Sequence, residues 1–375
     1  MKPLADISIP ASAAAGPTRF AAARRVLEQA IADRAFPGAS YGVFHQGQLL
    51  TLDALGRFTY EADSTPVTPS TIYDLASLTK VLATTAAAML LYERGIFKLD
   101  ARLGDILPGF VVGMRRGSGR ERLTLRMLLA HSSGLPAYIP FFEQHPTPQG
   151  LLRAVLHTPL EVRAGTRAEY SDLGFILLGK ALEVLSGDYL ARFCERNIFN
   201  PLELRSLRFC PPPAWQPHIP PTENDTTFRH RIIQGEVQDE NCFVLGGAAG
   251  HAGLFGRAAD VLRFAQVMLL NSAPKSNPPQ LFSEETIRLF TTRQDKPEGT
   301  TRALGWDTPS NPSSSGKYFG PRSFGHLGYS GTSLWVDPDR KLAVALLTNR
   351  TWPDRSSKAI QAVRPAFHDA IVESL

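Results

Sequence analysis

Strand-like runs lie near both ends of this chain, and a long stretch of predicted helices and loops separates them. Residues 39–45 and 48–55 are two such runs, joined by a short turn. Residues 332–336 and 341–349 are two more, rich in β-branched and apolar side chains, with a turn at Asp337-Pro-Asp between them. Because strands bury their apolar faces only within a paired sheet, the two ends of the chain are expected to share one antiparallel sheet.

Amphipathic helices are predicted next to these strands. Residues 18–35 carry apolar side chains at helical spacing before the first strand, and residues 358–373 do so after the last. Between the strand pairs, residues 76–94 read as an Ala- and Leu-rich helix ending at Gly95. The expected fold class is therefore α+β, an antiparallel sheet flanked by N- and C-terminal helices, with a large, mostly helical lobe inserted.

A single domain over residues 1–375 is expected, because no linker separates autonomous units. Its α/β lobe would comprise about residues 18–75 and 320–375, and its helical lobe about residues 76–319, with a cleft between them. The 375 residues are 43% hydrophobic and 20% charged, which excludes a disordered chain.

Charge, cysteine content and hydropathy exclude several function classes. The net charge of +5 is mild, the Arg-rich segment 115–122 reads as a solvated loop, and no nucleic-acid motif accompanies it. Cys194, Cys210 and Cys242 are too widely spaced for a disulfide framework or a zinc site. No apolar run is long enough to span a bilayer, and no signal peptide is visible. A cytoplasmic location is expected, or a periplasmic or secreted one if a signal peptide was removed.

Two kinds of serine-nucleophile motif occur in the sequence. Residues 38–42 have the form Gly-x-Ser-x-Gly, but that motif works only at a sharp strand-to-helix turn, and Ser40 lies within an alternating strand. Ser-x-x-Lys occurs three times, and the copies that begin at Ser272 and Ser314 lie in loops. Only Ser77-Leu-Thr-Lys80 opens a predicted helix, where the spacing puts both side chains on one face.

Ser-x-x-Lys chemistry needs that geometry. A serine hydroxyl is a weak nucleophile until a base takes its proton, and a lysine serves if burial or a second cation lowers its pKa. The structural alternative is that Ser77 caps the helix and Lys80 lies on the surface. Two segments favour the functional interpretation: Tyr170-Ser-Asp172 precedes an apolar helix, and the glycine-rich residues 325–331 precede a strand.

With these motifs in this order, the sequence resembles the penicillin-recognising serine hydrolases, which include class C β-lactamases, DD-peptidases and family VIII-type carboxylesterases. Their motifs Ser-x-x-Lys, Tyr-x-Asn and Lys-Thr-Gly or His-x-Gly match Ser77–Lys80, Tyr170–Asp172 and His326–Gly328. Further similar segments extend the resemblance to most of the chain: LLAHSSGLP from Leu128, IFNPL from Ile198 and GLFG from Gly253.

The resemblance implies an acyl-serine mechanism without metal or organic cofactor. Ser77 would attack a carbonyl, Lys80 would accept the serine proton, and Tyr170 would relay it to the leaving group and then activate water. The backbone amides of Ser77 and Tyr329 would form the oxyanion hole. The residues expected to bind substrate are Asp172, His326, Gly328 and His251.

Two departures from the family pattern bear on the substrate. Position 172 is Asp where Asn is usual, and position 326 is His where true β-lactamases have Lys. Because a negative Asp172 and a mostly neutral His326 weaken attraction for a substrate carboxylate, a carboxylesterase acting on short-chain esters is expected, with weak or no β-lactamase activity.

Other activities of the same family stay open. Residues 235–241 and 246–253 resemble a signature of bacterial members that include a muropeptide amidase, although Gln238 replaces its first His. The further alternatives are a D-amino-acid peptidase, a true class C-like β-lactamase, and a penicillin-binding sensor that is acylated but not deacylated. In each case the expected partner is a small ester, amide or β-lactam, with no nucleic acid and no integral membrane segment, and the sequence carries no signal for an oligomeric state.

Overall fold

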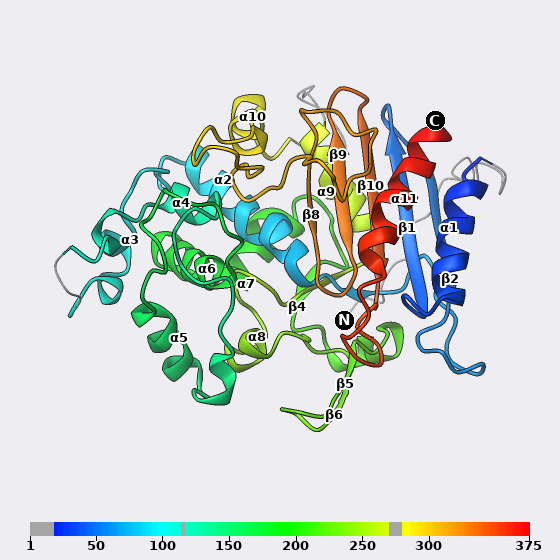
Figure 1. The fold of residues 1–375 in the computed structure, drawn as a ribbon, viewed down its shortest axis with the longest axis horizontal. Coiled ribbons are helices and arrows are strands. Elements are labelled where there is room, and N and C mark those ends of the chain that lie inside the picture. Colours follow the sequence, from blue (N-terminus) through cyan, green and yellow to red (C-terminus); the bar gives the residue numbers. More distant parts are fainter. Residues whose placement is uncertain (1–18, 114–116, 270–279) are drawn as a thin grey trace.

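A computed structural model of the protein describes residues 19–113, 117–269 and 280–375. It contains a five-stranded antiparallel sheet in the order β2-β1-β10-β9-β8 (Figure 1). Its strands come from both parts of the chain: β1 (Gly38–His45), β2 (Gln48–Gly56), β8 (Phe324–Leu327), β9 (Ser333–Asp337) and β10 (Leu342–Thr348). Because β1 pairs directly with β10, the prediction that the two ends share one sheet is confirmed.

Both faces of this sheet are covered by helices. The helices α1 (Ala21–Ala32) and α11 (Ile360–Glu373) lie side by side on one face, where Val344 packs with Leu27 and Phe367 (Figure 1). The other face packs against α9 (Ala258–Leu269). Side chains of β10 alternate between the two cores, as the two-residue period of a strand requires, and all seven β10 residues are buried.

The expected helix 76–94 is divided into three pieces. A 3₁₀ turn (Ala76–Leu78) is followed by a π-helical segment (Lys80–Thr85) and by α2 (Ala86–Glu93). The interruption begins where Ala76 adopts a left-handed backbone with φ of 47°, a conformation that a regular right-handed helix cannot contain. Short departures of this kind from α-helical geometry are frequent at functional sites.

Most of the remaining elements are short, apart from α5 with 10 residues and α6 with 15. The other helices are α3 (Leu103–Ile106), α4 (Leu125–Leu129), α5 (Pro148–His157), α6 (Asp172–Ser186), α7 (Leu190–Cys194), α8 (Glu240–Val244) and α10 (Glu284–Thr291). Two small sheets are formed by β3 (Tyr73–Asp74), β7 (Leu254–Gly256) and β4 (Arg208–Phe209), and by β5 (Glu223–Asp225) and β6 (Arg231–Ile233). In the part of the chain that the structure describes, no helix combines the length and apolarity needed to cross a membrane.

The structure also bears on the motifs and loops set aside above. Ser40 lies inside β1, as expected, and is buried. The copy of Ser-x-x-Lys at Ser272 lies outside the described residues. Residues 115 and 116 of the expected solvated loop 115–122 lie outside the described residues. The prediction is wrong at Arg120, which is 2% exposed and donates to the carbonyls of Phe110, Leu156 and Thr158. These three acceptors make burial of the guanidinium possible.

Candidate active site

A tight turn after β3 presents Ser77. The buried Asp74 carboxylate accepts the Ala76 amide at 2.8 Å and the Gln238 amide at 2.8 Å. Burial raises the pKa of Asp74 to about 6. The carboxylate thereby joins the left-handed Ala76 to a distant loop, and this fixes the backbone immediately before Ser77.

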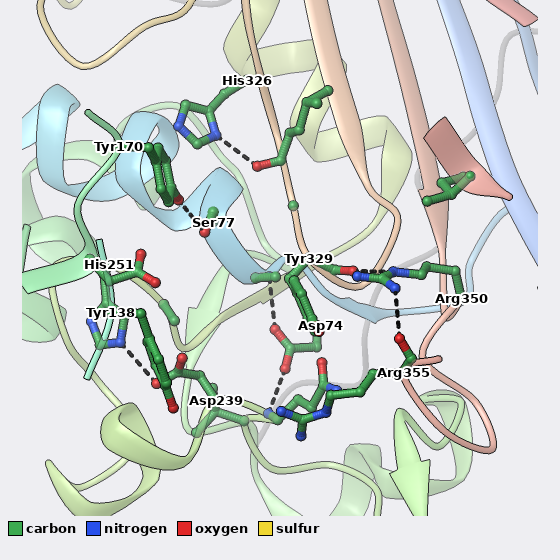
Figure 2. Close-up of a pocket in the computed structure, with 18 of the residues that line it drawn as sticks. Asp74, Ser77, Tyr138, Tyr170, Asp239, His251, His326, Tyr329, Arg350 and Arg355 are labelled. Atoms are coloured by element: carbon green, nitrogen blue, oxygen red, sulfur yellow. Dashed lines mark hydrogen bonds and ion pairs between the residues drawn. The ribbon is translucent and has the colours of Figure 1, made fainter. Parts of the chain in front are cut away.

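Two of the predicted catalytic side chains meet at the Ser77 hydroxyl. Tyr170 Oη donates to Ser77 Oγ at 2.7 Å, and Lys80 Nζ donates to it at 2.9 Å. Figure 2 shows Ser77 and Tyr170 pointing toward one another. Ser171 caps α6, since its Oγ accepts the Gly174 amide at 3.1 Å, so Asp172 is not the N-cap. The Asp172 side chain turns toward Lys80 instead.

Lys80 is fully buried, and all three of its ammonium hydrogens have acceptors. These acceptors are Ser77 Oγ, Asp172 Oδ1 at 2.7 Å and the His251 carbonyl at 2.9 Å. Burial lowers the pKa of Lys80, but the Asp172 carboxylate and Tyr170 outweigh burial, and the net pKa is raised. The lowered pKa that Lys80 would need to act as a base is therefore not found, because the Asp172 carboxylate favours the ammonium form.

Tyr170 is held between other rings. The His131 ring lies 4.7 Å from the Tyr170 ring, and His131 Nδ1 accepts the Ser171 amide at 3.0 Å. Burial raises the pKa of Tyr170, although Lys80 opposes the increase. Tyr170 is thus a neutral phenol in the resting site. Sequence reasoning gave His131 no role, although it lies in the segment LLAHSSGLP that extended the resemblance.

A glycine-rich loop supplies the third acceptor of Lys80. Thr84 Oγ1 donates to the Gly250 carbonyl at 2.6 Å, and a Cβ added at Gly250 would lie 2.0 Å from the Phe175 carbonyl. Glycine therefore lets this loop lie directly against α6. The side chain of His251 was expected to bind substrate, but it is 1% exposed, and its Nε2 lies 2.9 Å from Asp239 Oδ1.

The turn between β8 and β9 is tied to the segment that carries Ser77. Ser330 Oγ donates to the Asp74 carbonyl at 2.8 Å, and Thr332 Oγ1 donates to the Leu75 carbonyl at 3.1 Å. A Cβ added at Gly328 would lie 2.6 Å from the Leu75 carbonyl. Gly328 was expected to bind substrate, and close packing within the chain itself already requires a glycine there.

His326 is buried beside the same turn. Its Nδ1 lies 2.8 Å from the Leu327 carbonyl, and burial, with the charges of Lys80 and Arg302, lowers its pKa well below the ordinary value. The ring is therefore neutral at pH 7, and its Nε2 has no partner among the described residues.

A cavity of about 570 Å³ opens in front of Ser77. It is lined by the predicted residues Ser77, Tyr170, Asp172, His251, His326, Gly328 and Tyr329. Sequence reasoning missed the aromatic and cationic groups that also line it: Tyr138, Arg302, Arg350, Arg355 and Lys358. Arg355 binds Glu223 and Glu240, whereas Arg350 donates to the Tyr329 and Ser357 carbonyls. Over the described ranges, no cluster of three or more side chains could hold a metal ion.

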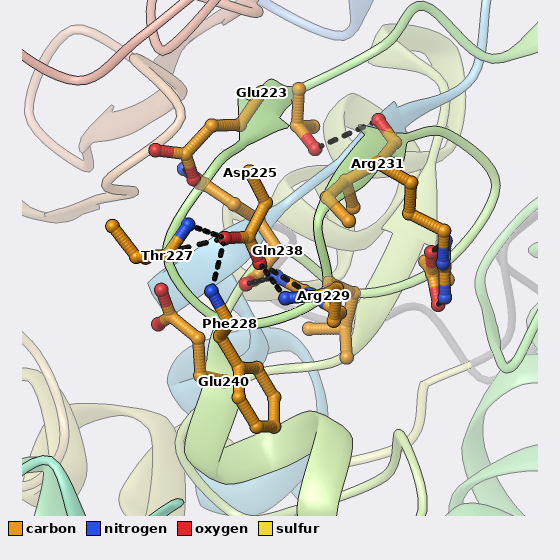
Figure 3. Close-up of polar contacts among 12 residues, drawn as sticks. Glu223, Asp225, Thr227, Phe228, Arg229, Arg231, Gln238 and Glu240 are labelled. Atoms are coloured by element: carbon orange, nitrogen blue, oxygen red, sulfur yellow. Dashed lines mark hydrogen bonds and ion pairs between the residues drawn. The ribbon is translucent and has the colours of Figure 1, made fainter. Parts of the chain in front are cut away.

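Polar contacts of the hairpin formed by β5 and β6 (Figure 3) reach residues 237 and 238, which line this cavity. The Asp225 carboxylate accepts the Thr227 and Phe228 amides at 3.0 and 2.9 Å and pairs with Arg229 at 2.9 Å. Arg229 in turn donates to the Val237 and Gln238 carbonyls at 2.7 and 2.6 Å. Because the Gln238 amide binds Asp74, this chain of contacts reaches from the hairpin to the turn before Ser77.

Residues 23–366 match the model of the Beta-lactamase family. The chain is 33% identical over 308 residues to the "Putative D-alanyl-D-alanine carboxypeptidase" of Escherichia coli strain K12, which covers 76% of this chain and 70% of that protein. It is 32% identical over 355 residues to the N-acetylmuramyl-L-alanine amidase of Bacillus subtilis strain 168, covering 84% and 77%. The solved structure of EstCE1, a hydrolase with promiscuous acyltransferase activity, shares the fold with a TM-score of 0.75 at 21% identity, covering 94% and 98%.

Proposed function

The chain belongs to the beta-lactamase family of serine hydrolases, and we propose that it cleaves amide bonds of muropeptides through an acyl-Ser77 intermediate. The observation that carries the proposal is the Ser77 hydroxyl, which lies within 2.7 Å of Tyr170 Oη and 2.9 Å of Lys80 Nζ at a cavity of about 570 Å³.

The proposed mechanism follows from the charges of these side chains. Since Lys80 is an ammonium ion and Tyr170 a neutral phenol, Tyr170 accepts the Ser77 proton as it gives its own proton to the leaving nitrogen. Lys80 keeps its charge and stabilises the negative charge that develops on Ser77 Oγ. In deacylation the same relay runs in reverse, with water in place of the amine.

The oxyanion hole is assigned to the backbone amides of Ser77 and Tyr329. Within the described residues, neither amide donates a hydrogen bond to another protein group. Both are therefore free to bind the carbonyl oxygen of a substrate. Losing one such donor typically costs about 3 kcal/mol of transition-state stabilisation.

Two cations at the cavity are available to an anionic substrate, beside five acidic side chains that also line it: Asp74, Asp172, Asp239, Glu240 and Asp307. Arg350 has only carbonyl acceptors, and the exposed Lys358 has no acidic partner among the described residues. Cations of this kind attract the carboxylates of a muropeptide. The relative from Bacillus subtilis, by its name, cleaves N-acetylmuramyl-L-alanine, and the same bond is the proposed target here.

Hydrolysis of short-chain esters is the second candidate, and the neutral His326 favours it. With no cation at this position of the third motif, a substrate needs no carboxylate beside β8. The sequence expectation that esters are preferred stays a prediction.

Three substrates assayed side by side test these proposals: N-acetylmuramyl-L-alanyl-D-isoglutamine, p-nitrophenyl butyrate and nitrocefin. Ser77→Ala should abolish turnover and the covalent adduct seen by mass spectrometry, whereas the matched control Ser40→Ala should keep both. Ester turnover without release of N-acetylmuramic acid would select the second candidate. Stoichiometric acylation without turnover would indicate a sensor, and full activity of Ser77→Ala would overturn every acyl-Ser77 scheme.

A further inference from the structure

One guanidinium group binds most of the turn that carries Tyr329. Arg364 Nη2 donates to the Gly328 carbonyl at 2.6 Å and to the Thr332 carbonyl at 2.9 Å. Arg364 Nε donates to the Gly331 carbonyl at 3.2 Å. The Gly328 carbonyl belongs to the same peptide group as the Tyr329 amide, which is the proposed oxyanion donor. Arg364 therefore binds one end of the peptide whose other end is assigned to the substrate.

Arg364 is buried, and its charge has no acidic partner among the described residues. It lies on α11, which packs against α1 and the sheet, and its side chain is buried but reaches the lining of the cavity. Among the described residues it has no carboxylate partner, so its charge is offset only by carbonyl dipoles. Burial lowers the pKa of Arg364 to about 9, and the nearby charge of Arg350 acts in the same direction.

We propose that Arg364 is a positioning residue of the oxyanion hole, which fixes and polarises the Gly328–Tyr329 peptide so that the Tyr329 amide donates more strongly. A donor on a peptide carbonyl draws electron density from the amide and strengthens the N–H at the other end. Fixing the peptide in advance also removes the reorganisation that would otherwise accompany catalysis. The inference rests on the proposed function, because it needs Tyr329 as an oxyanion donor.

The other proposed oxyanion peptide is held in the same way. The Ala76 carbonyl, which shares its peptide group with the Ser77 amide, accepts Thr79 Oγ1 at 2.6 Å. In both proposed oxyanion peptides, the carbonyl at the other end thus accepts a hydrogen bond from a side chain.

Arg120 provides a matched control, because it is also a buried arginine with three backbone carbonyl acceptors. It does not line the cavity. Arg364→Met and Arg120→Met therefore remove the same kind of contact, one beside the proposed oxyanion hole and one away from the cavity.

Two probes report on the hole without depending on the natural substrate. A fluorophosphonate labels an active serine covalently, and phenylboronic acid forms a tetrahedral adduct that places an oxygen in the oxyanion hole. For the folded fraction, Arg364→Met should slow labelling of Ser77 and weaken boronate inhibition, each by about 10-fold or more. Arg120→Met should lower the Tm and leave both rates for the folded protein unchanged. Guanidinium chloride at millimolar concentration should restore part of the labelling rate to Arg364→Ala.

The outcomes separate the two proposals. If the wild-type protein is not labelled at Ser77, the proposed function fails, whatever Arg364 does. If it is labelled at Ser77, and the Arg364 variants react and bind boronate as the wild type does, the inference about Arg364 is overturned. Should Arg364→Met fail to fold, Arg364→Lys is tested in its place. The lysine keeps the charge but cannot reach all three carbonyls, so it should show an intermediate loss in labelling rate and boronate inhibition.

Discussion

Asp172 sets the charge of Lys80, because a carboxylate 2.7 Å from a buried ammonium favours the charged form. The two possible roles of Lys80 therefore require opposite protonation states. As a base, Lys80 must lose its proton before acylation, and activity would rise as it does so. As a permanent cation, it must keep that proton, and activity would fall at alkaline pH.

Asp172→Asn distinguishes these roles. Removing the carboxylate lowers the pKa of Lys80, so under the cationic role the alkaline decline of kcat/KM should move to lower pH by about one unit or more. A pH–rate profile of both proteins measures the shift. If instead the acidic limb of the pH–rate profile of Asp172→Asn shifts to lower pH and activity near pH 7 increases, Lys80 is the base and the relay through Tyr170 is wrong.

At the residue scale, motif spacing predicted that Ser77, Lys80, Tyr170 and Asp172 would come together, and their contacts agree with this. It did not predict the direction of the Lys80 pKa. That direction depends on how near Asp172 lies to an amine that is completely buried, and no sequence pattern encodes that distance. Arg364 was missed for a related reason, since its partners are backbone carbonyls, which leave no mark in the sequence.

The loop that ends at His251 depends on close contact with α6. Gly250→Ala would place a Cβ 2.0 Å from the Phe175 carbonyl, so the loop must move away from α6. This movement breaks the hydrogen bond from Lys80 to the His251 carbonyl. We expect a loss of about 1–3 kcal/mol in the free energy of unfolding, together with reduced turnover. Gly174→Ala, in α6 itself, is the control, because its Cβ would meet nothing closer than 3.6 Å. Chemical denaturation of both variants checks the difference, and equal stabilities would contradict the packing argument.

The β5–β6 hairpin should be sensitive to acid. Burial alone raises the pKa of Asp225, but backbone amides and Arg229 outweigh burial and lower it below its ordinary range. Ionised Asp225 therefore contributes stability above about pH 4, and this contribution is lost as the pH falls through its folded-state pKa. Arg229→Met should cost about 3 kcal/mol at pH 7, because it leaves a buried carboxylate unpaired. The difference in Tm between Arg229→Met and the wild type should shrink below pH 4. A difference that stays constant with pH would exclude the Asp225–Arg229 pair as the cause of the acid sensitivity.

Whole elements were predicted well where hydrophobic periodicity was clear, as for β1, β10, α1 and α11. Residues 77–93 are helical, as expected, but they are not uniformly α-helical, because apolar composition does not reveal where 3₁₀ and π-helical turns occur or that Ala76 is left-handed. The solvated-loop prediction failed at Arg120 because three carbonyls satisfy its buried guanidinium, and only the folded chain brings those carbonyls together.

On the scale of the molecule, the net charge of +5 and the cations of the cavity act together on an anionic substrate. For N-acetylmuramyl-L-alanyl-D-isoglutamine, kcat/KM should fall by about threefold or more between 0.05 and 0.5 M NaCl, since the screening length shrinks below about 10 Å. For the neutral p-nitrophenyl butyrate it should change little. Steady-state kinetics over this range provide the comparison, and identical slopes for both substrates would show that cavity charge does not select the substrate.

The turn that carries Tyr329 is held by hydrogen bonds from Arg364, which lies on α11 near the end of the given sequence. During synthesis on the ribosome, residues 74–77 are made long before residue 364 leaves the exit tunnel. A nascent chain can therefore hold the nucleophile and still lack a finished oxyanion turn. Hydrolysis should therefore begin only once residue 364 has emerged and α11 has packed against the sheet.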